Sequence, residues 1–320
     1  MTHDSMNQAT KDVRVLKGVL FLLAFSIPIS ISVAELAAFL SVACWLFLLR
    51  KKEFRTLAWS NPLLLPIALF VFVAIGVSFV WGVRPMRSLD KSHRLLFLLL
   101  AFMMEAGLKR EKSVCTWKNV RWTAFAFITG CTLLGFYDLI RIPWYAYGGG
   151  EIYDAGNMRD PQFYMCALCL LIALWAYGVH REKRWLWALV LFANAAGLIL
   201  HFKRGVWIAF CCSMLLIAIK TKRWKILIAL VLCALALLLV PQVRERIARL
   251  KEVTEVQTGG RYVLWSDTAP ALFKAYPYGM GWSCVTHDDM MEHSTYPVQE
   301  KLNHLHNNIL QMRLEQGLPQ

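Results

Sequence analysis

Nine apolar runs, each near the length of a membrane-spanning helix, constrain the fold of this chain more than any other feature. They cover residues 15–33, 34–49, 61–82, 95–108, 122–140, 163–179, 185–202, 206–219 and 226–240. Helices are the economical way across a hydrocarbon core about 30 Å thick, because each backbone amide is then paired within its own segment. With 58% hydrophobic residues and a mean hydropathy of +0.46, the sequence predicts an all-α polytopic membrane protein.

The basic residues predict the orientation of these spans. Loops after the even-numbered spans carry 16 Lys and Arg residues, whereas loops after the odd-numbered spans carry 8. The positive-inside rule therefore places the N-terminus in the cytoplasm and the long final segment outside. The net charge is +14, but the cations form short clusters between apolar runs, which argues against nucleic-acid binding. The first run lacks a small-residue cleavage site, so we expect an uncleaved span.

The chain divides by composition into two parts. Residues 1–240 are predicted to form a transmembrane bundle of about nine helices, and residues 241–320 a large loop on the outer face. Most cysteines fall inside apolar runs, where they serve as small packing residues. Cys284 stands alone in the loop, and we expect it to be accessible to labelling from the outer face.

Several cations lie on the outer face, where the charge rule disfavours them. A bound anionic ligand would explain their presence, and contact with lipid headgroups is the alternative. These residues are Arg84, Arg87, Lys91, Arg94, Arg159, Lys203 and Arg204.

For Arg204, the sequence position indicates a specific chemical role. Lys203 and Arg204 leave almost no loop between two apolar runs, so Arg204 should lie at the start of a helix at the outer boundary. A guanidinium there presents a planar fork to a phosphate, and the positive end of the helix adds to the field. The alternative role for Arg204 is that of an interfacial anchor.

The long final segment contains the other candidates. If it is helical, Arg261 and Trp265 share a face. His304 or His306 suits general-base chemistry, because an imidazole near neutral pH can accept a hydroxyl proton. The alternative is that both are ordinary polar residues of the loop. A metal site using Asp288, Asp289 and Glu292 is less favoured, because no Cys or HExxH pattern accompanies the histidines.

The segments GGRYVLWSDTAPALFKAYPYGMG (Gly259 to Gly281) and LNHLHNNILQMRLEQGLP resemble the large periplasmic loop of the O-antigen ligase and polymerase superfamily. The ligase branch is favoured by SLDKSHRLLFLLL (Ser88 to Leu100) and HFKRGVWIAF (His201 to Phe210), which are similar to two further elements of that branch. The resemblance implies a C-type glycosyltransferase fold of about twelve spans, and hence further helices C-terminal to this sequence.

The resemblance also implies a reaction and its residues. It indicates transfer of a glycan from undecaprenyl diphosphate to a sugar hydroxyl of lipid A-core, with inversion, without a metal ion or cofactor, on the periplasmic face of the bacterial inner membrane. His306 would be the base, because it directly precedes an asparagine, and Arg204 and Arg261 would stabilise the diphosphate. The implied substrate-binding residues are Asp90, Arg94, Lys203, His304, Asn307, Arg159 and Trp265.

Two other functions are weighed against a ligase. An O-antigen polymerase would use the same donor and extend a lipid-linked glycan. A transporter of lipid-linked glycan would place ionisable residues near the middle of its spans. We identify Glu35 and Glu105 as the ionisable residues within the runs, both near predicted ends, which disfavours transport.

Overall fold

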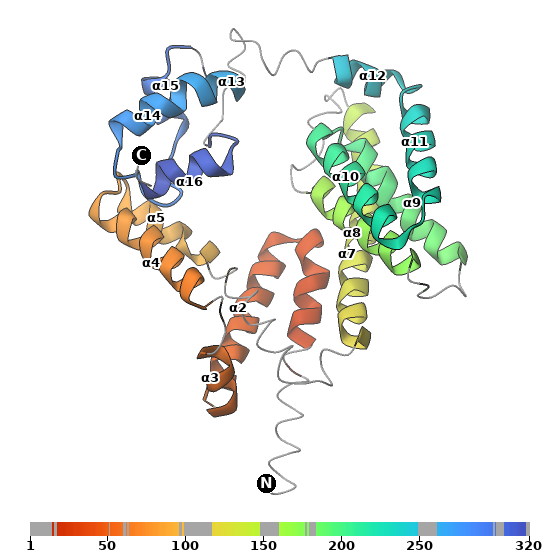
Figure 1. The fold of residues 1–320 in the computed structure, drawn as a ribbon, viewed down its shortest axis with the longest axis horizontal. Coiled ribbons are helices and arrows are strands. Elements are labelled where there is room, and N and C mark those ends of the chain that lie inside the picture. Colours follow the sequence, from red (N-terminus) through yellow and green to blue (C-terminus); the bar gives the residue numbers. More distant parts are fainter. Residues whose placement is uncertain are drawn as a thin grey trace, which may run out of the picture. The chain divides into compact units, whose positions relative to one another are not determined.

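The computed structural model describes residues 15, 18–50, 52–59, 62, 64–95, 98, 117–147, 160–176, 178, 184–248, 261–296, 298 and 304–317. All regular elements in these ranges are helices (Figure 1), which confirms the all-α prediction for the part of the chain that they cover. The elements are a helix at Gly18–Ile29, α2 (Ile31–Leu48), α3 (Lys52–Trp59), α4 (Leu64–Val80), α5 (Pro85–Lys91), η1 (Ser92–Leu95), α7 (Trp117–Tyr147), α8 (Asp160–Ala176), α9 (Arg184–Leu200), α10 (Arg204–Thr221), α11 (Lys225–Leu237), α12 (Pro241–Ala248), α13 (Arg261–Val263), η3 (Leu264–Thr268), α14 (Ala269–Ala275), α15 (His287–His293) and α16 (Asn308–Gln316).

Apolar helices occupy eight of the nine predicted runs. Of these, Ile31–Leu48 and Arg121–Tyr145 within α7 are long and apolar enough to cross a membrane, and six others have 10–17 residues. The fourth run, 95–108, lies outside the described residues except for positions 95 and 98. The break between the first two helices falls at Ser30, earlier than predicted, where the Ser30 hydroxyl accepts from the Val33 amide in the manner of a helix cap.

Contacts divide the chain into two compact units. Unit 1 comprises residues 1–48 and 108–247, and unit 2 comprises residues 49–107 and 248–320. The domain prediction, a bundle over 1–240 and a loop over 241–320, stays a prediction. Each unit is described below by itself.

Unit 1 is built around α7, α8, α9 and α10, which pack against one another (Figure 1). Their shared core includes Ile128, Tyr164, Leu168 and Leu198. Helices α7 and α9 approach closely at Gly135, where a Cβ atom would lie 2.7 Å from the Ala193 carbonyl oxygen. This close packing leaves little freedom in the relative placement of the ends of these helices.

Unit 2 joins α4 and α5 to the C-terminal helices α13–α16. The segment between α14 and α15 is pinned on both sides, because Met280 donates to the Leu314 carbonyl and accepts from the Val83 amide. Gly279 and Gly281 have φ of +93° and +97°, a conformation that side chains disfavour, and a Cβ on Gly279 would meet the Gly317 amide nitrogen at 2.7 Å. The sequence Pro277-Tyr278-Gly279-Met280-Gly281 thus forms a tight turn that lets three segments of unit 2 meet.

Candidate functional site

The predicted residues of the long final segment lie close together in unit 2. Arg261 begins α13, and Trp265 follows one turn later in the π-helical segment η3. The Trp265 Nε1 atom donates a 2.8 Å hydrogen bond to the carbonyl oxygen of Leu305, which separates His304 from His306. This bond ties the turn that carries both histidines to the helix that carries Arg261. Short π-helical segments are frequent at functional sites.

The turn at His304–His306, called the histidine turn, is also held in place through the side chain and the amide of Leu305. The Leu305 side chain is fully buried in the core of unit 2. Its amide donates a 2.8 Å hydrogen bond to Gln311 Oε1 on α16. The residue between the two histidines is therefore held by its side chain, its amide and its carbonyl, which leaves the flanking imidazoles little freedom of position.

His306 has an unusual backbone and a shifted pKa. Its φ is +53°, a left-handed conformation that is uncommon outside glycine and is concentrated at functional sites. The His304 and His306 ring centroids lie 3.9 Å apart. Burial, together with His304 and Arg261, lowers the pKa of His306 to about 4. The imidazole is therefore neutral at pH 7 and has a lone pair available for a proton, but this pKa makes it a weaker base than an ordinary histidine.

Asn307 caps helix α16. Its side-chain Oδ1 atom accepts hydrogen bonds of 3.0 Å from Ile309 N and 3.2 Å from Leu310 N. Such a cap satisfies amides that the first turn of a helix leaves without partners. The cap fixes the start of α16 directly after His306; a role for Asn307 in substrate binding remains a prediction.

The structure gives less information on three other predicted substrate-binding residues, Asp90, Arg94 and Arg159. Asp90 is exposed and forms a 2.8 Å ion pair with Lys91. Arg94 lies in η1, but its side chain is outside the described residues, and so is all of Arg159. Substrate-binding roles for Asp90, Arg94 and Arg159 therefore stay predictions.

Arg84, one of the cations that a bound anion would explain, is engaged within the protein. Its Nη1 and Nη2 atoms donate to the two carboxylate oxygens of Asp289 at 2.8 and 3.0 Å, and Nη1 also donates to the Cys284 carbonyl. Burial raises the pKa of Asp289, but hydrogen bonds from Arg84 and Thr286 outweigh it and hold that pKa below its usual range. The Arg84 guanidinium therefore fixes α15 to the start of α5.

The labelling expectation for Cys284 is wrong. Its side chain is fully buried, and its Sγ atom lies 2.9 Å from Ser88 Oγ. The alternative metal site is affected as well, because Asp289 is committed to Arg84 while Asp288 and Glu292 are exposed. Both differences arise because α5 packs on this part of the loop, which the loop sequence alone does not reveal.

Lys203 and Arg204 lie in unit 1. Helix α9 ends at Leu200 and α10 begins at Arg204, so the predicted near-absence of a loop is correct. Phe202, with φ of +49°, makes the tight reversal, and the Trp207 indole closes it by donating to the Leu198 carbonyl at 3.1 Å. The backbone of Arg204 is thus fixed at a helix start, whereas its side chain is outside the described residues.

Comparison with known proteins adds the decisive observation. Residues 187–319 match the family model described as O-antigen ligase. This matched region makes up less than half of the chain and is similar to the O-antigen ligase family. Neither the search of curated proteins nor that of solved structures found a match. The matched region includes the following predicted site residues: Lys203, Arg204, Arg261, Trp265, His304, His306 and Asn307.

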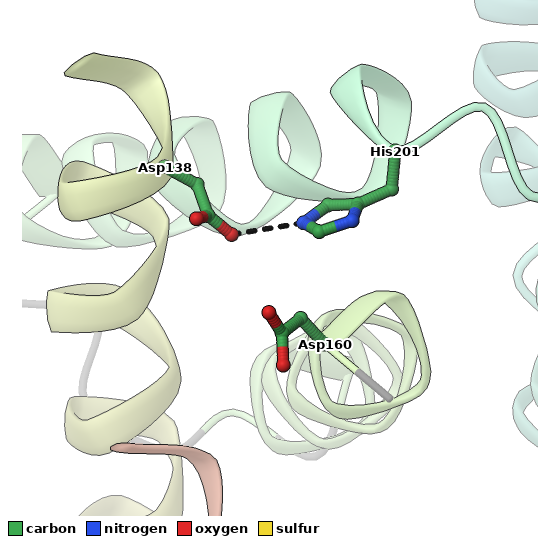
Figure 2. Close-up of side chains that lie close together, drawn as sticks. All are labelled: Asp138, Asp160 and His201. Atoms are coloured by element: carbon green, nitrogen blue, oxygen red, sulfur yellow. Dashed lines mark hydrogen bonds and ion pairs between the residues drawn. The ribbon is translucent and has the colours of Figure 1, made fainter. Parts of the chain in front are cut away.

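One polar cluster in unit 1, between α7, α8 and the end of α9, was not predicted from the sequence (Figure 2). Asp138 on α7 is fully buried, and its Oδ2 atom accepts from the Tyr164 hydroxyl at 2.6 Å and contacts His201 Nε2 at 2.8 Å. Arg141 Nη2 lies 2.7 Å from Asp138 Oδ1 and 3.8 Å from Asp160 Oδ2. The cluster ties α7 and α8 to the residue that precedes Phe202.

The expectation that Glu35 and Glu105 are the ionisable residues within the apolar runs is therefore wrong. Asp138 lies inside the run 122–140, and its partners Tyr164 and His201 come from two other runs. An acidic residue in an apolar run signals a buried partner, and His201 and Tyr164 are side chains able to provide one. The sequence shows the acidic residue within the apolar run, but it does not show which side chains pair with it.

Asp138, Asp160 and His201 have the side chains of a metal site, with ligand atoms within 4.8 Å of one another. However, the Arg141 guanidinium already contacts both carboxylates and contributes positive charge at the place where a divalent cation would do so. A metal ion would have to displace it. The cluster is better explained as an internal ion-pair network that fixes the α9–α10 reversal.

Proposed function

We propose that the chain is an O-antigen ligase that transfers a glycan from undecaprenyl diphosphate to a sugar hydroxyl of lipid A-core, with inversion and without a metal ion. The observation that carries the proposal is the histidine turn, where a neutral His306 lies near Arg261 within the region that matches the O-antigen ligase family. Transfer to a hydroxyl requires a proton acceptor, and departure of a diphosphate requires positive charge. These two side chains supply both.

The proposed reaction proceeds by direct displacement. The acceptor hydroxyl oxygen attacks the anomeric carbon on the face opposite the diphosphate, and a new carbon–oxygen bond forms. His306 accepts the hydroxyl proton as the bond to the diphosphate oxygen breaks. The electron pair of that bond leaves with undecaprenyl diphosphate, whose charge Arg204 and Arg261 stabilise.

The remaining candidates have binding roles in this proposal. Lys203 and His304 bind the substrates, and Trp265 holds the histidine turn in place. Asp90, Arg94, Arg159 and Asn307 contact the donor or acceptor.

The proposed enzyme is a multi-pass protein of the bacterial inner membrane with its site on the periplasmic face. The apolar helices in eight of the predicted runs and the unequal distribution of loop charges support this placement. Arg204 and the histidine turn then belong to the same face, as a shared diphosphate requires.

The experiment that tests the function is identification of the product. The purified full chain is incubated with lipid-linked glycan and lipid A-core, and the new linkage is located by mass spectrometry and its anomeric configuration by NMR. A ligase attaches the glycan to lipid A-core with inverted configuration. Extension of the lipid-linked glycan, with or without lipid A-core, would instead identify a polymerase, and unchanged substrates would contradict both.

A further inference from the structure

A cavity of about 1240 Å³ lies within unit 1 between α8, α9, α10 and α11. Its walls are almost entirely apolar, with Leu171, Leu191, Met214 and Leu230 among the lining residues. Protein interiors are close-packed, and an apolar cavity offers water few hydrogen-bond partners. A space of this size and character is therefore suited to hydrocarbon.

Helix α11 forms one wall of the cavity. None of its residues is buried. Ala229, Leu230, Cys233 and Ala234 line the cavity at spacings of three and four residues, which place them on one face of the helix. On the remaining surface, large side chains such as Ile228 and Leu235 are more than half exposed. Both sides of α11 thus need an apolar environment that the described protein does not supply.

One end of the cavity is cationic. Lys222, Arg223 and Lys225 lie at the turn between α10 and α11, and no Asp or Glu occurs among the described residues that line the space. The turn is fixed, because Lys222 is left-handed with φ of +54° and its amide bonds to Ala218 and Ile219 carbonyls. The Arg223 guanidinium carbon lies 5.6 Å from the centroid of the Trp175 ring. Positive charge is therefore held next to apolar walls.

This cationic end is separate from the proposed diphosphate site. Arg204 starts α10, whereas Lys222 follows its last residue. An 18-residue helix at 1.5 Å per residue spans about 27 Å, so the two groups of cations lie at opposite ends of one helix. An anion at Lys222 is consequently not the reacting diphosphate.

We propose that the cavity binds an anionic phospholipid, with its acyl chains between α11 and the α8–α10 wall and its phosphate at Lys222, Arg223 and Lys225. Basic pockets between membrane helices favour anionic headgroups, and aromatic side chains such as Trp175 and Trp224 suit headgroup depth. The apolar walls can contact the acyl chains of a phospholipid. A free phosphate ion has no acyl chains, so the walls favour the phospholipid. The inference is independent of the transfer reaction.

The test uses the full chain in phosphatidylcholine nanodiscs that contain a small fraction of lipid with brominated acyl chains. Four of the tryptophans line the cavity and report on a bound brominated chain: Trp175, Trp187, Trp207 and Trp224. Brominated phosphatidylglycerol is compared with brominated phosphatidylcholine at the same fraction. The proposal predicts stronger quenching by the anionic lipid, and equal quenching by the two would overturn it.

Substitutions identify the headgroup site. Replacing Lys222, Arg223 and Lys225 together by Gln should lower the preference for phosphatidylglycerol by on the order of a hundredfold, since each basic residue contributes roughly fivefold. The matched control replaces Arg50, Lys52 and Arg55, three cations in and beside α3 and outside the cavity, by Gln. An equal loss in the control would show that the preference is a general charge effect and overturn the site.

A second pair of variants tests whether the acyl chains of the lipid occupy the cavity. Ala234→Phe fills part of the cavity, whereas Ala236→Phe adds the same volume on the same helix outside the lining. The excess quenching by phosphatidylglycerol should fall in the first variant and persist in the second. If Ala234→Phe leaves the excess unchanged, the lipid binds elsewhere. If neither lipid quenches the wild-type cavity tryptophans, protein covers the cavity, and the proposal is wrong.

Discussion

The Trp265 indole nitrogen and the Leu305 carbonyl oxygen lie 2.8 Å apart and form a hydrogen bond between positions 40 residues apart in the chain. Because Leu305 lies between His304 and His306, this contact determines where both imidazoles lie. Trp265 therefore acts as a positioning residue for the proposed base through the backbone, whether or not its exposed face also meets a sugar.

Trp265→Phe tests this positioning role. The phenyl ring keeps much of the packing but lacks the donor, so we expect kcat to fall by tenfold to a hundredfold, since small misplacements of a reacting group are costly. The free energy of unfolding should fall by only about 1 kcal/mol, the net value of one hydrogen bond. Turnover and denaturant unfolding of the same preparation measure both. Trp144→Phe on the exposed side of α7 is the control and should change neither.

The pH dependence tests the assignment of His306. With a pKa of about 4, His306 stays neutral from pH 7 down to about pH 5, so kcat/KM should be flat there and decrease as the pH falls through 4. His304→Gln removes one cause of the lowered pKa and should move this decrease to higher pH. An unchanged profile in that variant would assign the titration to another group.

The same pKa has a consequence for folding. The pKa of His306 in the folded protein lies below the ordinary histidine value of 6.5, so the unfolded chain binds more protons between about pH 4 and 6.5. The contribution of this group therefore makes folding less favourable as the pH falls through that window.

Much of the helical fold was predictable, because apolar runs specify helices wherever backbone amides must pair internally. The Asn307 cap and the capping box of Thr286 and Asp289 at the start of α15 also follow recognisable local patterns. The pairing of Arg84 with Asp289 was not predictable, because the two positions are 205 residues apart and each has several possible partners. The same holds for His201 and Asp138, whose contact depends on how α7 and α9 pack.

The two arginines have distinct expected phenotypes. Arg204→Ala and Arg261→Ala should each lower turnover by about 10²–10³-fold at saturating donor, as expected for a preorganised charge contact in the transition state. Lysine at either position should restore part of the activity, because its point charge lacks the guanidinium fork. Arg244→Gln, an exposed residue on α12, controls for loss of positive charge and should be neutral.

The double arginine variant tests whether both residues meet one diphosphate. If they do, the combined loss should be smaller than the product of the single losses, because the second substitution acts on a contact already weakened. Strictly multiplicative losses would indicate that the two arginines act at separate sites.

The orientation is tested by labelling at a position that the structure exposes. Asp288→Cys places a thiol at the exposed start of α15, and an impermeant maleimide should label it in intact cells from the periplasm. The unsubstituted chain is the control, because Cys284 is buried. Labelling of Asp288→Cys that requires opening of the inner membrane would reverse the proposed topology.

The most direct test of the account is the transfer rate of His306→Ala with saturating donor, measured in EDTA alongside the wild-type chain. We predict that the wild type retains its activity in EDTA, whereas the variant loses about 10²–10⁴-fold in the chemical step, the range for a positioned base. Donor binding should persist in the variant. A variant rate close to wild type, or wild-type activity abolished by EDTA and restored by Mg²⁺ or Mn²⁺, would contradict the proposal that His306 acts as the base in a metal-independent transfer.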